Sequence, residues 1–298
     1  RAAAAAFCPF VCSAAPQLFG LDSYDTLGLP INLDNVFRAD EYIRWRSLRE
    51  REDSRFLALT LPNLLMRKPY ERDYNSPQGM HFVEDVAGKN NNKYLWGNAC
   101  FALGSVLIRE FSEVGWFSHI RGVPRDYLGG GLVTQFPSLS YKTDSSKAMI
   151  SLCHCYQTPY AVFNNCPSLQ VSKNYGNKSA NANSRISSML QQILCGSRFA
   201  QYIKVIIRDK VGSYVTADAC QRFLQDWLDE YTTGRDDLSW EMMARYPLRE
   251  ARVRVVEEPG KPGHYSSIVH LKTHYTVDHL VSELKLTTAL NQIETGKV

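Results

Sequence analysis

The sequence predicts an α/β (α+β) fold, and three patterns carry this prediction. Residues 55–62 (RFLALTLP) form a short alternating apolar run that ends at a proline, which is typical of a buried strand. Residues 186–231 place apolar side chains at helical spacing, and after Pro247 the spacing drops to two. Strands therefore flank a helical middle.

Composition narrows the class of protein. The 298 residues suffice for one large or two ordinary domains, and 44% are hydrophobic and 21% charged. These values exclude a wholly disordered, collagen-like or polytopic membrane protein. The longest apolar run, from Ala99 to Ile108, is about half of what a bilayer crossing requires, so no membrane insertion is expected. The net charge of +4 is too small to indicate nucleic-acid binding by itself.

The first half of the chain predicts helices around the strand at 55–62. Residues 1–15 (RAAAAAFCPFVCSAA) imitate a signal peptide, but no initiator Met precedes them; we expect a buried alanine-rich helix and a chain that lacks its true N-terminus. Residues 33–51 predict one or two surface helices, and residues 94–111 predict another helix. Residues 70–93 are rich in Asn, Asp, Pro and Gly, which predicts a loop.

Three polar or glycine-rich breaks suggest how the chain divides. The first is the loop at residues 70–93, the second comprises 129–131 and 138–147, and the third is 172–184. The last is polar and turn-forming and directly precedes the helical middle, so we predict the main boundary near residue 180, with domains at 1–180 and 181–298.

The second half predicts helices followed by strands. Apolar residues at helical spacing on both sides of Gly196 predict two helices or one kinked helix: Ile186, Leu190, Ile193, Leu194, Tyr202, Ile203, Ile206 and Ile207. Thr216 is the predicted N-cap of a further helix and Gly234 its stop. The stripe of that helix comprises Phe223, Leu224, Trp227, Leu228 and Tyr231.

Beyond Pro247, alternation predicts two strands, around 251–256 and 264–272, joined by the turn EPGKPG. Residues 277–288 fit a helix or a third strand equally well. The strand-rich end looks too small to form a sheet of its own.

The eight cysteines do not form a disulfide scaffold, since they make up under 3% of the chain. Most have apolar neighbours, which indicates small buried hydrophobes in a reducing cytoplasm. Cys153, His154, Cys155 and Cys166 are potential zinc donors. Cys-x-Cys is tighter than the usual chelating spacing, however, and an extended segment turns His154 away from both cysteines, so no metal is expected.

Catalytic motifs are weak. The glycines at 129–131 lack the Gly-Lys-Ser/Thr of a phosphate loop and predict a flexible turn. Ser282 and Lys285 match the Ser-x-x-Lys pattern of some acyl-transfer enzymes, without its companion motifs. A hydrolase using Cys153 or Ser282 therefore remains only an alternative, and we expect no enzyme and no cofactor.

A second alternative is nucleic-acid binding by the basic helices at 185–210. Their cations are Arg185, Arg198, Lys204, Arg208 and Lys210. Solvated helix faces, or a seat for an acidic protein partner, agree better with the small net charge, so no nucleic acid is expected.

Several long stretches together resemble one family. They include WRSLREREDSRFLALTLP, YLWGNACFALG with GWFSHIRG, KSANANSRISSMLQQILCGSRFAQYIKVIIRDKVGSY, and YPLREARVRVVEEPGKPGHY. In this order they resemble the large subunit of the type VI secretion contractile sheath (TssC or VipB, and IglB in Francisella-like systems), from about residue 1 to 290. Gln201 stands where the family usually has His, and the chain is shorter than its relatives between Lys142 and Leu152; such departures favour the Francisella-type branch.

The resemblance implies a structural protein with a phage-tail-sheath fold in the bacterial cytoplasm. It implies pairing with a small sheath subunit (TssB, VipA or IglA-like) and stacking of these heterodimers as a helical tube around hexameric inner-tube rings. Contraction of the tube would drive effector delivery, and an AAA+ unfoldase would disassemble it through a region outside this chain. It also implies that late strands pair with neighbouring protomers, at Val253, Val255, Tyr265, Ser267, Val269, Leu271, Leu284 and Leu286.

Overall fold

The computed structural model describes eleven segments of the chain. They are residues 1–24, 32–72, 82–86, 92–123, 130–133, 149–155, 160–210, 216–235, 237–257, 265–277 and 280–290. The predicted breaks at 129–131, 138–147 and 70–93, and the turn at 258–263, lie wholly or partly outside them.

The first half forms a five-stranded sheet in the order β1-β2-β6-β7-β5. Its strands are β1 (Phe10–Ser13), β2 (Leu57–Leu61), β6 (Ile150–His154), β7 (Ala161–Phe163) and β5 (Leu132–Val133). The first three are parallel, whereas β7 is antiparallel to both of its neighbours. The strand predicted at 55–62 is confirmed as β2, between β1 and β6.

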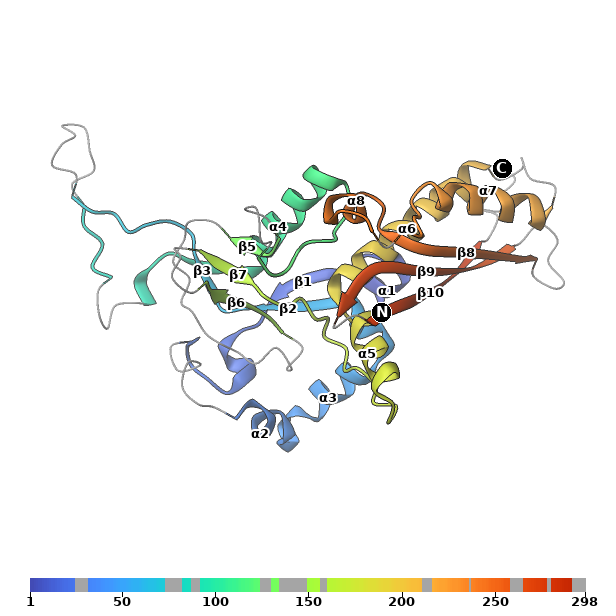
Figure 1. Ribbon diagram of the computed structural model, residues 1–298. Coiled ribbons are helices and arrows are strands. Elements are labelled where there is room, and N and C mark those ends of the chain that lie inside the picture. The colour runs from blue at the N-terminus through green and yellow to red at the C-terminus, as the bar shows by residue number, and fades with distance from the viewer. Residues whose placement is uncertain are drawn as a thin grey trace, which may run out of the picture.

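Helices cover both faces of this sheet (Figure 1). Helix α4 (Ala99–Val114) packs on one face, where its residues join Ala58 and Ile150 in a buried cluster. Helices α2 (Leu33–Arg38) and α3 (Ile43–Glu50) lie on the other, beside the cluster around Leu61. Burial on both faces explains why β2 is apolar except at Thr60, whose buried hydroxyl lies 3.0 Å from Ser13 Oγ.

Two predicted helices have different bounds in the structure. Helix α4 starts at Ala99 because β4 (Trp96–Asn98) pairs with β3 (Asn63–Leu65). Helix α1 comprises only Ala2–Ala6, with Ala3 as its one buried residue, so a buried helix over the opening residues is wrong. The residues after it form β1, because pairing with β2 outweighs the weak helix propensity of FVCS.

The helical middle contains two helices, as predicted, but the break lies elsewhere. Helix α5 (Lys178–Ser187) ends where Ser188 Oγ donates to the Arg185 carbonyl, and α6 (Leu190–Lys210) continues through Gly196. Gly196 is buried inside α6. Tertiary packing there overrides the roughly 1 kcal/mol that glycine costs inside a helix.

The N-cap at Thr216 is confirmed: its hydroxyl accepts a hydrogen bond from Ala219 N at 3.3 Å, and α7 (Ala217–Asp229) follows. The helix ends five residues before Gly234, because Thr233 N donates to the carbonyl of Leu248 in the next strand. A short helix, α8 (Trp240–Arg245), precedes that strand and is capped by Ser239.

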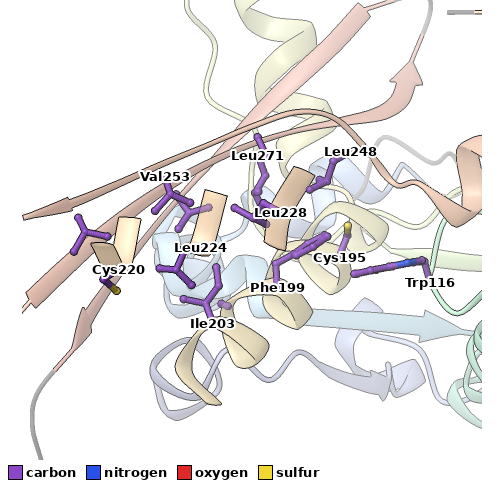
Figure 2. Close-up of a cluster of buried hydrophobic side chains, with 14 residues drawn as sticks. Trp116, Cys195, Phe199, Ile203, Cys220, Leu224, Leu228, Leu248, Val253 and Leu271 are labelled. Atoms are coloured by element: carbon purple, nitrogen blue, oxygen red, sulfur yellow. The ribbon is translucent and has the colours of Figure 1, made fainter. Parts of the chain in front are cut away.

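The second sheet is antiparallel, in the order β10-β9-β8. Its strands are β8 (Leu248–Glu257), β9 (Tyr265–Val277) and β10 (Leu280–Leu290), so the ambiguous tail is a strand. The expectation that this end is too small to form its own sheet is wrong. Helix α7 packs against β8, and α5 and α6 pack against β9 and β10, so burial makes three strands sufficient; Figure 2 shows the cluster formed with α6 and α7.

Helix α6 contributes to the cores beneath both sheets. Leu190 joins the cluster under β6 and β7, while Phe199 and Ile203 join the cluster under β8 and β9. The boundary near residue 180 stays a prediction. No helix within the described residues is long and apolar enough to cross a membrane.

Candidate interprotomer sheet

The edges of the second sheet decide where another strand can be added. β9 is central: Val269 lies opposite Val253 of β8 and Leu286 of β10. The predicted pairing residues Tyr265, Ser267 and Leu271 also lie between two strands of the same chain. Within this fold they have no free backbone edge, which restricts the predicted pairing with neighbouring protomers to β8 and β10.

Alternation gives β8 one buried and one exposed face. Ala251, Val253 and Val255 are each 7% exposed and face the core, whereas Arg252 and Arg254 are exposed. Figure 2 shows Val253 of the sheet on one side of Leu224 and Leu228, with Ile203 and Phe199 of α6 on the other. Helix α7 therefore lies between β8 and α6 and fixes the edge strand.

Three outward backbone groups of β8 are bound by two glutamine side chains of α7. Val253 N donates to Gln225 Oε1 at 3.0 Å, and Gln225 Nε2 donates to the Ala251 carbonyl, also at 3.0 Å. Val255 N donates to Gln221 Oε1 at 3.0 Å. In sequence, Gln221 and Gln225 look like ordinary polar positions of an amphipathic helix, so only their i, i+4 spacing opposite a strand hints at this arrangement.

Aromatic side chains at the base of α7 join it to α6. The ring of Trp227 lies 5.9 Å from that of Phe199 and 5.3 Å from that of Tyr231, in both cases nearly edge to face. Such pairs add about 0.5–1.5 kcal/mol beyond area burial. Trp227 is only partly buried, so the predicted stripe is core at Leu224 and Leu228 and partly exposed at Trp227.

A buried polar contact fixes the central strand. Gln192 Nε2 donates to Thr273 Oγ1 at 2.6 Å, and Thr273 Oγ1 lies 3.0 Å from Gln192 Oε1. Both side chains are nearly fully buried, and such groups are costly to leave unpaired. This contact therefore specifies how β9 sits on α6.

Two models of known protein families match this chain. A family model described as "EvpB/VC_A0108, tail sheath N-terminal domain" matches residues 1–149. A second, described as "EvpB/VC_A0108, tail sheath gpW/gp25-like domain", matches residues 179–290 and so includes the whole second sheet. The chain belongs to this tail sheath family.

A curated tail sheath relative is the type VI secretion system sheath protein TssC1 of Pseudomonas aeruginosa (strain PAO1). It is 34% identical over 313 aligned positions, which cover 97% of this chain and 62% of the relative. The chain thus spans less than two thirds of that relative's length. The resemblance to the large sheath subunit of type VI secretion systems is confirmed.

Tail sheath proteins are structural proteins and not enzymes, which removes the hydrolase alternative. Ser282 lies in β10, where the register shifts between Val281 and Glu283, and not on a helix. The Cys153 Sγ lies 3.8 Å from the Ser151 carbonyl in β6. Burial raises the pKa of Cys166 to about 12, so this thiol stays protonated at neutral pH.

The structure also bears on the two other sites considered in the sequence, the glycine loop at 129–131 and the zinc donors. The Cβ of a residue at Gly131 would lie 2.3 Å from the Phe163 carbonyl oxygen, and Gly131 N donates to the Gly122 carbonyl, so this glycine serves close packing. The expected zinc-free state stays a prediction; the described residues contain no group of three or more potential metal donors.

The cations of α6 mostly contact the protein itself. Arg198 donates to the Gly115 carbonyl, Lys204 Nζ lies 4.7 Å from the centre of the Phe7 ring, and Arg208 pairs with Asp209. Arg185 is exposed. These contacts argue against a continuous basic surface for nucleic acid.

Proposed function

We propose that the chain is part of the large subunit of a bacterial type VI contractile sheath. It pairs with the small sheath subunit, and the heterodimers stack in the cytoplasm as a helical tube around hexameric inner-tube rings. Contraction drives effector delivery, and an AAA+ unfoldase acts on a region outside this chain. Family membership supports the proposal, and the observation that carries it is a small sheet with an edge strand at each side.

We place the link between protomers at β10. Backbone groups of successive residues in an antiparallel strand point alternately to the two sides. The backbone N–H of Val253 points away from β9. The backbone groups of its partner Val269 therefore point toward β10, where they pair with those of Leu286. Lys285 and Thr287 therefore direct their backbone groups outward. An extended segment of a neighbouring protomer adds there through several hydrogen bonds, each about 0.5–1.5 kcal/mol net.

Electron microscopy of the chain produced together with its small subunit tests the function. The expected result is long hollow tubes that neither subunit forms alone. A soluble heterodimer that never forms tubes, under conditions in which a full-length sheath pair does, contradicts the proposal for this chain.

Two proline substitutions in β10 test the strand link. Thr287→Pro removes an outward N–H and leaves the ladder to β9 intact, so the heterodimer should persist while tubes are lost. Leu286→Pro removes an inward ladder donor and should destabilise the sheet itself. Tubes of normal length from Thr287→Pro protein would show that β10 is not the linking edge.

A further inference from the structure

The side chain of Gln225 makes the bonds that a neighbouring strand would make. In a parallel pair, one residue donates to the carbonyl of residue i−1 and accepts from the N–H of residue i+1 of its neighbour. Gln225 donates to the Ala251 carbonyl and accepts from Val253 N, both at 3.0 Å, and so occupies the position of a residue opposite Arg252. Gln221 makes only the accepting bond, from Val255 N, two residues further along β8.

The amide of Gln225 is held in the required orientation. Its Nε2 also donates to Asp229 Oδ1 at 2.8 Å, one helical turn further along α7. The Asp229 carboxylate and the Ala251 carbonyl are both acceptors, so the amide nitrogen of Gln225 must face them. Its Oε1 then faces Val253 N. Leu224 and Leu228 are fully buried beside it and fix the helix against the strand.

We propose that Gln221 and Gln225, the glutamine pair, serve as a built-in substitute strand that closes the β8 edge, so that a strand from another sheath protomer adds only at β10. This rests on the proposed strand link of the sheath. Exposed edges pair without discrimination unless a cover prevents it. With one edge closed, each protomer accepts one strand, and the polymer grows in one geometry.

The same placement limits the predicted pairing residues. Val253 and Val255 already have partners for their outward N–H groups, so they do not receive a strand from a neighbour. The proposed link therefore lies in β10 around Leu284 and Leu286. The backbone groups of the residues that alternate with them, Lys285 and Thr287, point away from β9.

Residue-resolved hydrogen exchange of the unassembled heterodimer tests the cover directly. The double variant Gln221→Met/Gln225→Met keeps side-chain length and helix propensity but removes both amides. We expect exchange at Val253 N and Val255 N to rise about tenfold, the factor that corresponds to one net hydrogen bond. The matched control is Arg222→Met/Asp226→Met, an i, i+4 pair of exposed residues on the same helix, which should leave these rates unchanged. Equal rates in wild type and glutamine variant would overturn the proposal.

Exchange during assembly tests which edge is used. In wild-type tubes, the amides of Lys285 and Thr287 should gain protection, while those of Val253 and Val255 change little. In the glutamine variant, Val253 and Val255 should gain protection in irregular aggregates. New protection at β8 in wild-type tubes would overturn the proposal. If wild-type protein forms no tubes, the proposed function fails, yet the experiment on the unassembled heterodimer still decides whether the glutamine pair covers β8.

Discussion

The guanidinium carbon of Arg198 lies 4.4 Å from the centre of the Trp116 ring, which connects the middle of α6 to the turn after α4. The same group lies 4.6 Å from the Phe111 ring and donates to the Gly115 carbonyl and the Tyr202 hydroxyl. Helix α6 also carries core residues of both sheets. Arg198 therefore helps to join the two halves of the chain.

Arg198→Ala should lower the free energy of unfolding by about 1.5–3 kcal/mol, the range for hydrogen bonds to a charged group. Arg198→Lys should recover only part of this, because an ammonium lacks the planar fork that stacks on aromatic rings. Urea unfolding measures both. Arg208→Ala, whose ion pair with Asp209 is exposed, is the control and should stay within about 0.5 kcal/mol of wild type. Equal effects of both alanine variants would contradict the joining role.

Leu224 and Trp227 should differ in how alanine substitution affects stability. Leu224 is fully buried, so Leu224→Ala should cost about 2–5 kcal/mol. Trp227 is partly buried, so Trp227→Ala should lower the free energy of unfolding by less than the roughly 3–5 kcal/mol expected for a fully buried tryptophan. Thermal and urea unfolding of both variants give the order. A larger loss at Trp227 would show that the aromatic contacts at the base of α7 dominate.

Gly131 and Gly104 form a matched pair of glycine substitutions. A methyl group at Gly131 meets the backbone of Phe163 and Arg121, and overpacking of this kind costs about 1–3 kcal/mol. Gly104 lies inside α4, and its Cβ would meet no atom within 4 Å. Gly104→Ala should therefore stabilise the protein by up to about 1 kcal/mol. Opposite shifts of the unfolding midpoint are the expected outcome, and a neutral Gly131→Ala would contradict the close approach.

Glu84 should make stability depend on pH under acidic conditions. Two hydrogen bonds from Arg67, at 2.6 and 2.8 Å, and one from Tyr70 N lower the pKa of Glu84 from 4.5 to about 2. Because the folded-state pKa is depressed, the contribution is complete above pH 4.5 and is lost as the pH falls toward 2.

Glu84→Gln should remove this part of the pH dependence, which melting curves between pH 6 and 2.5 measure. Glu241→Gln, in an exposed pair with Arg245, is the control. If the melting temperatures of wild type and Glu84→Gln change equally with pH throughout this range, the Arg67 contact contributes nothing to the pH dependence.

Cys153 in β6 and Cys155 just after it should be dispensable. Cys153→Ser/Cys155→Ser protein should fold normally, and elemental analysis of the purified chain should find no stoichiometric zinc. Cys166→Ser places a hydroxyl at a fully buried position, where the Ile120 carbonyl, 3.6 Å from the Cys166 sulfur, can accept its hydrogen bond, so the cost should stay below the roughly 1–3 kcal/mol of an unpaired hydroxyl. One zinc ion per chain would overturn the structural role assigned to these cysteines.

The sequence by itself determined the local elements with strong periodicity or specific end signals. Thr216 caps α7 through a local hydrogen bond that its hydroxyl accepts from Ala219 N, and the alternation of Ala251, Val253 and Val255 determines which face of β8 is buried. The family resemblance rests on residues that local pattern alone does not explain, and matched domains over 1–149 and 179–290 confirm it.

The tertiary structure decided what depends on distant partners. Residues 280–290 became a strand because β9 supplied the backbone bonds, and α6 runs through Gly196 because that glycine is buried. The bonds of Gln225 to β8 could not be assigned from sequence, since Ala251 and Val253 lie 26 and 28 residues away. Periodicity reports which face of an element is apolar, but hydrogen bonds across an edge are set only when two elements meet.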